Sequence, residues 1–233
     1  DAACSKKAKI GMKNRLMLFS SVTQKLFMAI TGAGFVLFLV FHGTMNLVSI
    51  ISPEAYDFIC ETLGANWYAV LASLMIAGLA GLHILIALVL SVENFLARGF
   101  VRYKRKQRPQ GVSWSSNNML VLGLLILGGL ALHLLNFWYK MQFAELMGRE
   151  SANGMALVRE LFSHPVYSIV YLLWLVVLWL HLSHGVSSML QSVGWNSESW
   201  KQRWRIIGTV VATVIVLLFA AVVIYYWLIY PAL

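Results

Sequence analysis

Five of the six histidines lie inside long apolar stretches of the chain. They are His42, His83, His133, and the close pair His181 and His184. A polar ring at membrane depth is costly without a partner, and ionisable residues there usually mark a cofactor, a proton path or an ion path. Paired imidazoles that face each other across a helix bundle are the ligands that the iron of a b-type haem requires. The placement of these histidines therefore indicates haem binding.

Membrane-spanning helices must position these histidines. Hydrophobic residues make up 60% of the 233 positions and charged residues 12%, which lies outside the range of ordinary soluble domains. Five apolar runs exceed the roughly 20 residues that an α-helix needs to cross a bilayer. They lie near residues 26–50, 67–92, 117–141, 165–190 and 206–230. We therefore predict an all-α membrane protein in which residues 1–233 form one domain, a bundle of five transmembrane helices.

The distribution of charge predicts the orientation of this bundle. Fifteen of the 18 Lys and Arg residues lie on one side of the expected spans, within residues 6–25, 98–108 and 201–205. The positive-inside rule places this side, with the N-terminus, in the cytoplasm and the C-terminus outside. The net charge of +9 is thus a topology signal. A nucleic-acid partner is not expected, because the basic residues border the spans and no nucleic-acid-binding motif accompanies them.

Cysteines and the N-terminus add little. Cys4 falls on the inner side and Cys60 on the outer side, so the two are not expected to pair within one molecule. The start of the chain is charged and lacks a long apolar stretch before residue 26, and the first apolar run is long enough to remain as a span. A cleavable signal peptide is therefore not expected.

Depth in the membrane sorts the histidines into two pairs. His42 and His133 each lie about 16 residues, or roughly 24 Å, into spans that run outward, so both belong to the outer half. His83 and His181 lie equally far into spans that run inward, so both belong to the inner half. Two pairs at two depths predict two haems stacked across the membrane. Zinc and copper fit less well, because no carboxylate or thiolate joins the histidines.

Residues that share a helix face with these histidines would suit a flat macrocycle. Phe35 and Phe38 are expected beside His42, and Gly129 beside His133, because residues three, four and seven apart share a face. Small residues let a ring approach closely, and apolar residues exclude water. A glycine such as Gly129 is equally compatible with plain helix–helix packing, which small residues commonly serve in membranes.

At this point the chain resembles the dihaem, single-subunit cytochrome b anchor of succinate dehydrogenases and quinol:fumarate reductases. The resemblance covers nearly the whole chain, with five spans and one ligand histidine in each of the first four. Its most specific stretch is His181-Leu182-Ser183-His184-Gly185, which is similar to the His-x-Ser-x-Gly pattern of the family's fourth span. Thr31-Gly32, the stretch from Cys60 to Trp67, and Gly194-Trp195 also look like family features.

The resemblance implies a role in respiration. Such a subunit anchors a flavoprotein and an iron–sulfur protein on the cytoplasmic face of a bacterial inner membrane. Through two haems b it passes electrons between the iron–sulfur subunit and menaquinone or menaquinol. The dicarboxylate chemistry belongs to the partner subunits, so this chain is the quinone-reactive part of an oxidoreductase. The sequence leaves open the direction of the reaction and whether such complexes dimerise.

The resemblance also implies which residues do this work. His42 with His133 would bind the outer haem iron, and His83 with His181 the inner one. Between His181 and His184, depth and the family pattern favour His181 as the ligand, which leaves His184 beside the haem. One departure concerns proton transfer: some dihaem members carry a glutamate two residues before the fourth-span ligand, and this chain has Trp179 there.

Quinol oxidation releases two protons with its two electrons, so it needs a base within hydrogen-bond reach of a ring hydroxyl. Glu61 is the first candidate, because it lies in the outer connection just before the second span. Asp57 lies one turn earlier if this connection is helical. His164 lies at the outer mouth of the fourth span, before Pro165, and is another candidate. An ordinary solvated loop residue remains the alternative for each of them.

Two other classes of protein compete with this interpretation. The cytochrome b subunit of a formate dehydrogenase or a hydrogenase also binds two haems through helix histidines, but the even distribution of one ligand per span argues against it. A haem-free transporter would be expected to have repeat symmetry and broken helices at mid-membrane, and neither is visible in the sequence. The absorption spectrum of the reduced protein separates the haem proteins from the transporter.

Overall fold

The computed structural model describes residues 20–64, 66–98, 114–195 and 197–230, and in these residues the chain is helical. Five helices in this part are long and apolar enough to cross a membrane. They are α2 (Ser21–Ile51), α4 (Trp67–Arg98), α6 (Met119–His133) with its continuations η1 (Leu134–Phe143) and α7 (Ala144–Leu146), α9 (Pro165–Ser192), and α10 (Glu198–Ile224) with its continuation η2 (Tyr225–Ile229). The prediction of a five-span, all-α membrane protein is confirmed at this level.

The observed helices extend beyond the predicted apolar runs. The first and last helices begin at Ser21 and Glu198, five and eight residues before the expected starts at residues 26 and 206. Lys201, Arg203 and Arg205, which we expected in a connection, therefore lie in the first turns of α10. Hydropathy marks only the apolar part of a helix, whereas the helix itself continues into its polar flanks. Cys4 and the basic positions below residue 20 and from 99 to 113 lie outside the described residues.

Two connections contain helices of their own. Helix α3 (Pro53–Thr62) follows α2, and its cap residue Ser52 accepts a hydrogen bond from the Ala55 amide at 3.2 Å. Helix α8 (Gly154–Ser163) precedes α9 and begins at Asn153, whose side chain accepts from the Ala156 amide at 2.8 Å. A four-residue helix, α5 (Trp114–Asn117), leads into α6. The connections that contain α3 and α8 are thus ordered.

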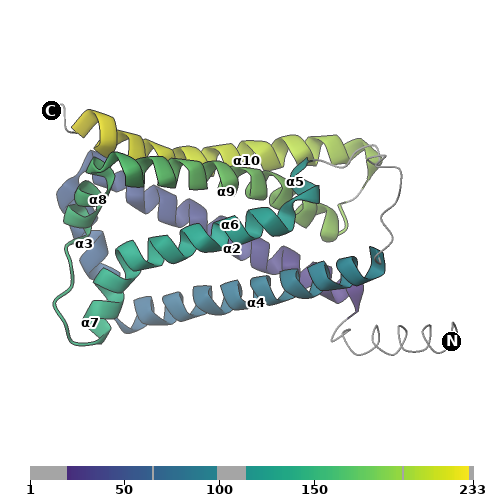
Figure 1. Cartoon of the computed structure of the whole chain (residues 1–233), viewed down its shortest axis with the longest axis horizontal. Coiled ribbons are helices and arrows are strands. Elements are labelled where there is room, and N and C mark those ends of the chain that lie inside the picture. Colours follow the sequence, from purple (N-terminus) through teal and green to yellow (C-terminus); the bar gives the residue numbers. More distant parts are fainter. Residues whose placement is uncertain (1–19, 65, 99–113, 196, 231–233) are drawn as a thin grey trace, which may run out of the picture.

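The long helices run side by side along the bundle (Figure 1). Helix α2 packs against α4, α9 and α10, while α9 packs against α6 and α10. Helices α3, α7 and α8 gather at one end of the bundle, which we call the α3/α8 end. At the opposite end, α9 finishes and α10 starts, and we call this the Trp204 end. Helix α2 is therefore the main packing partner of α4.

Helices α9 and α10 form the best-packed pair. In their most apolar windows 28% of the residues are buried, against 6% in those of α4 and of the helix formed by α6, η1 and α7. A glycine permits the close approach of the pair, because a Cβ at Gly208 would lie 2.9 Å from the carbonyl oxygen of Ser183. The two least covered helices carry His83 and His133, so lipid, a bound group or another chain must cover their remaining faces.

A π-helix follows His133 directly and was not predicted. In η1 the wider helical turn changes which side chains face the bundle, and such segments often occur at functional sites. Gln142 is consequently turned inward and is 8% exposed. Its amide oxygen accepts from Ser73 Oγ at 2.7 Å and from Trp138 Nε1 at 2.8 Å. Its amide nitrogen donates to the Gly64 carbonyl at 2.9 Å, which ties this span to the start of α4.

Candidate functional site

The structure brings His42 of α2 and His133 of α6 into direct contact. Their ring centroids are 5.9 Å apart and the ring planes make an angle of 81°. Two imidazoles that bind one metal through bonds of about 2 Å place their centroids roughly 6 Å apart. The spacing of this pair would therefore allow both imidazoles to bind one metal ion.

Aromatic rings enclose this pair. Phe38 stacks on His42 at 5.3 Å, as its spacing of four residues predicts, and Phe219 of α10 lies 5.7 Å away. His133 contacts Phe137, Tyr171 and Trp174 at centroid distances of 5.2, 6.3 and 6.0 Å. Phe137 belongs to the π-helix and Tyr171 and Trp174 to α9. Rings from four helices thus surround the pair, which is half-buried, and give it the low-polarity setting that a cofactor site needs.

Gly129 serves helix packing in this structure. A Cβ at Gly129 would collide with the indole ring of Trp174, whose Nε1 donates to the Ile126 carbonyl at 3.2 Å. The glycine one turn before His133 therefore admits the indole of α9. The sequence left open whether Gly129 makes room for a macrocycle or for a neighbouring helix. The contact with Trp174 supports the second interpretation, close packing between α6 and α9.

The second pair is His83 of α4 and His181 of α9, which lie near each other, close enough for their protonated rings to repel. Thr31 Oγ1 lies 2.9 Å from His83 Nδ1, and Phe35 meets the same ring edge-on at 5.5 Å. We expected Phe35 beside His42, but it contacts His83 of α4, the helix that packs against α2. His181 Nδ1 is buried and has no hydrogen-bond partner within the described part of the chain.

His184 lies one turn from His181 toward the Trp204 end. It is half-buried, and it interacts electrostatically with His181 and with Arg205 of α10. The neighbourhood of Arg205 gives His184 a polar, cationic setting, whereas apolar side chains of α9 and α10 surround the part of the bundle nearer mid-membrane. This arrangement suits the role expected for His184, which is to lie beside the polar edge of a bound group.

Polar side chains continue from His42 toward the α3/α8 end. Asn46 donates to the His42 carbonyl at 2.8 Å, and the Tyr56 hydroxyl donates to Asn46 Oδ1 at 3.4 Å. Burial is the main cause that raises the pKa of Tyr56 above its ordinary value, so the phenol stays protonated and acts as a donor at neutral pH. Burial likewise raises the pKa of the Cys60 thiol to about 11, so Cys60 is an unreactive neutral thiol.

The three candidate proton acceptors lie at the α3/α8 end in different settings. Glu61 is exposed near the end of α3. Asp57 lies one turn earlier on the same helix, and its Oδ1 accepts from the Met155 amide at 3.1 Å, so this carboxylate caps α8. His164 is exposed at the start of α9, with its ring 6.5 Å from that of Tyr167. Of Asp57 and Glu61, Glu61 therefore has the carboxylate that is more open to a ligand.

Trp179, two residues before His181, links two helices. Its Nε1 donates to Thr213 Oγ1 of α10 at 2.9 Å, and its carbonyl accepts from Ser183 Oγ at 2.6 Å. The indole thus strengthens the α9–α10 contact.

In the sequence, Thr31 stood out only as part of the dipeptide Thr31-Gly32. The feature that could have indicated its contact with His83 is a hydroxyl side chain inside an otherwise apolar run.

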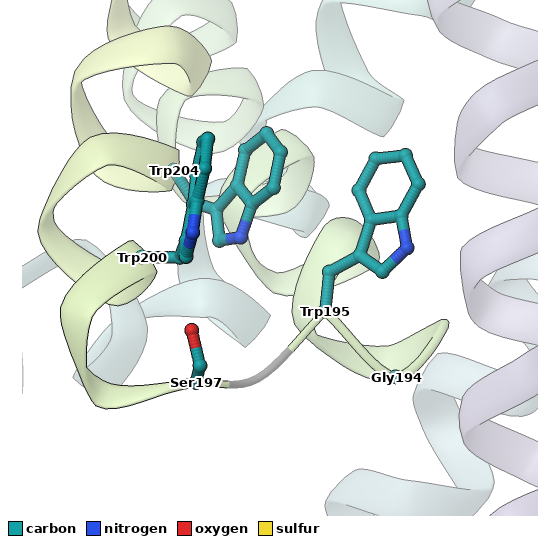
Figure 2. Close-up of a pocket in the computed structure, with 5 residues that line it drawn as sticks. All are labelled: Gly194, Trp195, Ser197, Trp200 and Trp204. Carbon is teal, nitrogen blue, oxygen red and sulfur yellow. The ribbon is translucent and has the colours of Figure 1, made fainter.

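Three tryptophans stack at the Trp204 end. Trp204 lies between Trp195 and Trp200, with centroid distances of 5.2 and 5.1 Å (Figure 2). The Arg203 guanidinium lies 4.8 Å from the centroid of the Trp200 ring. These indoles, Gly194 and Ser197 line a cavity of about 340 Å³. Indoles of this kind are typical of the boundary between lipid and water, where one edge is apolar and the other is wet.

A Trp204→Ala variant is expected to weaken the junction between α9 and α10. Two stacking contacts and a half-buried indole are lost, which should cost about 2–3 kcal/mol and lower the apparent Tm by on the order of 5 °C. Thermal unfolding in detergent measures this effect. Trp114→Ala is the matched control, because Trp114 is 54% exposed at the start of α5. Equal Tm values for the two variants would contradict the structural role of the stack.

Comparison of the chain with family models, with curated proteins and with solved structures gave no match, so its function has to be argued from the residues described above.

Proposed function

We propose that this chain is the membrane anchor and electron-transfer subunit of a succinate:quinone oxidoreductase, with two haems b held by its helix histidines. The observation that carries the proposal is the contact between His42 and His133 across α2 and α6, inside an aromatic enclosure. The proximity of His83 to His181 supports a second site. The sequence resemblance to the dihaem anchors supplies the substrate class.

The residues of both pairs suit b-type haem. Imidazole nitrogens are its ordinary axial ligands, and the enclosure of apolar and aromatic rings supplies the dry surroundings that a haem protein uses to set its potential. His42 and His133 would hold one group, and His83 and His181 the other. When bound, haem supplies reversible one-electron transfer. The chain's own part is to orient the four imidazoles, to keep water away from them and to carry protons at the quinone site.

The proposed orientation follows from charge. The Trp204 end carries Lys201, Arg203 and Arg205 and would face the cytoplasm of a bacterial inner membrane. A flavoprotein and an iron–sulfur subunit would bind on that side. The α3/α8 end would then face outward. His83 and His181 would hold the group on the side of the iron–sulfur subunit, and His42 and His133 the group on the side of menaquinone.

Glu61 is the proposed proton acceptor for menaquinol at the α3/α8 end. Its carboxylate is exposed near the end of α3, whereas the Asp57 carboxylate is engaged by the Met155 amide. The donor chain from Tyr56 through Asn46 to the turn of His42 gives this end a polar route toward the pair. His164 remains a second group that could take a proton.

Two measurements test this function: the haem content of the purified protein, and the identity of the proteins that co-purify with it. The pyridine haemochrome assay should give two haems b per chain, and affinity purification from membranes should recover a flavoprotein and an iron–sulfur protein. Menaquinol added to the complex should reduce both haems. One haem or none in the wild-type chain would reject the two-site scheme, and haems without these partners would assign the chain to another respiratory enzyme.

Replacing His181 by Ala should remove one haem, whereas His184→Ala should retain both. The reason is that His181 interacts with His83 across the bundle, while His184 interacts with Arg205 at its polar edge. The two variants differ in position by a single helical turn, so each is the control for the other. Haem content and the reduced absorption spectrum report the result; the opposite pattern would exchange the two roles.

A further inference from the structure

Thr31 is a buried hydroxyl on α2 that contacts one histidine of the inner pair. Its side chain is 1% exposed, and Oγ1 lies 2.9 Å from His83 Nδ1. Phe35, one turn further along α2, meets the His83 ring at an interplanar angle of 88°. The His83 ring is therefore set by two residues of α2, the helix that also carries His42 of the other pair.

The hydrogen bonds of Thr31 decide which atom donates. A threonine hydroxyl has one proton, and here Oγ1 lies 2.8 Å from the Phe27 carbonyl and 3.2 Å from that of Met28. Those carbonyls can only accept, so the hydroxyl proton points to them, in the back-bond common for threonine in helices. Toward His83 the hydroxyl is left with a lone pair. His83 must then donate through Nδ1–H, and its lone pair lies on Nε2.

We infer that Thr31 is a positioning residue for the inner site: it accepts the Nδ1 proton of His83 and so makes Nε2 the ligand nitrogen. The inference rests on the haem ligation proposed above. A hydrogen-bond acceptor on the far nitrogen of a ligating histidine fixes its tautomer and raises its basicity. A more basic ligand stabilises ferric iron, so Thr31 lowers the midpoint potential at this site.

Within the part of the chain that the structure describes, the other three paired histidines have no equivalent acceptor. His181 Nδ1 has no partner within the described residues. The closest side-chain group to the His42 ring nitrogens is Asn46 Nδ2, at 3.4 and 3.5 Å, and an amide nitrogen donates. For His133, no side-chain hydrogen bond is found among the described residues. The effect of Thr31 should therefore be confined to the inner haem, which makes the outer haem an internal control.

The experiment is a redox titration of Thr31→Val, which keeps the shape of the side chain and removes the hydroxyl. In the full chain with its haems, we expect the inner-haem potential to rise, its EPR g-values to shift and the outer haem to stay as in wild type. Thr31→Ser should restore wild-type behaviour. Thr44→Val is the matched control, because Thr44 Oγ1 donates to the Val40 carbonyl at 2.8 Å in the same helix.

The outcomes separate the inference from the proposed function. A wild-type chain without haem would overturn both. Two haems with unchanged potentials in Thr31→Val would overturn the inference alone, and so would a Thr31→Ser variant that behaves like Thr31→Val. Loss of the inner haem in Thr31→Val with normal haems in Thr31→Ser supports it, because only the hydroxyl differs in kind. If Thr31→Val does not assemble, Thr31→Ala is judged by the same criteria.

Discussion

A His133→Leu variant is expected to retain one haem of two and to lose the one at the His42–His133 pair. The rings around this pair belong mainly to Phe38, Phe137 and Phe219, which cannot bind iron. The Tyr171 hydroxyl is engaged by Asn136 Nδ2 at 3.2 Å, and no water reaches a lipid-embedded helix to replace a ligand. The haemochrome assay should therefore fall from two haems per chain to one.

The matched control is His164→Ala, which removes a histidine that is exposed at the start of α9. This variant should keep both haems and an unchanged reduced spectrum. His42→Leu should reproduce the result of His133→Leu and lose the same spectral component. Two six-coordinate haems in His133→Leu would show that His42 has another partner, and the pairing of the histidines by depth would be wrong.

The five-span bundle could be predicted because its signals are local. Runs of apolar residues longer than a bilayer crossing must form helices, since the lipid interior leaves no other partner for the backbone. Counting residues along rigid helices also predicted His42 and His133 at the same depth, because the rise per residue is constant and equal counts in two parallel spans give equal depths. Equal depth allows the two rings to meet, but their contact also requires that the faces of α2 and α6 that carry them point toward each other.

The surroundings of the histidines could not be predicted in the same way. The π-helix after His133 changes which residues face inward. From Leu134 onward, a spacing of 3.6 residues per turn therefore assigns residues to the wrong face of the helix. The contact of Phe35 with His83 depends on how α2 and α4 are rotated against each other. The space beside Gly129 is filled by Trp174, a residue 45 positions away. A local sequence pattern cannot show which distant side chain fills such a space.

The roles of the acidic residues also depend on tertiary contacts. Asp57 and Glu61 are both carboxylates on one helix, four residues apart, and the sequence ranked Glu61 first only because it lies nearer the second span. The packing of α3 beside α8 gives Asp57 an amide to cap, at Met155, and leaves Glu61 exposed. This difference in engagement is the structural reason for testing Glu61 first.

A Glu61→Gln variant is expected to lose quinol-driven electron transfer by about 100-fold or more, which is the usual contribution of a general base. Glutamine keeps the size of the side chain and can accept a hydrogen bond, but it cannot remove a proton from a quinol hydroxyl. Haem content, the reduced spectra and assembly with the soluble subunits should be unchanged, because Glu61 lies on α3, away from the four ligand histidines along the chain. Steady-state menaquinol oxidation by the purified complex measures the loss.

The matched control for this variant is Glu54→Gln. Glu54 lies on the same helix and is exposed, and its carboxylate accepts a hydrogen bond from Ser52 Oγ at 3.1 Å. Turnover in Glu54→Gln should equal that of the wild type, so an effect of surface charge alone would appear in both variants and a catalytic effect in only one. Glu61→Asp, which keeps the base but shortens its reach, should retain part of the activity. Normal menaquinol oxidation in Glu61→Gln would instead assign proton removal to His164, since the Asp57 carboxylate would have to release the Met155 amide and uncap α8 before it could serve.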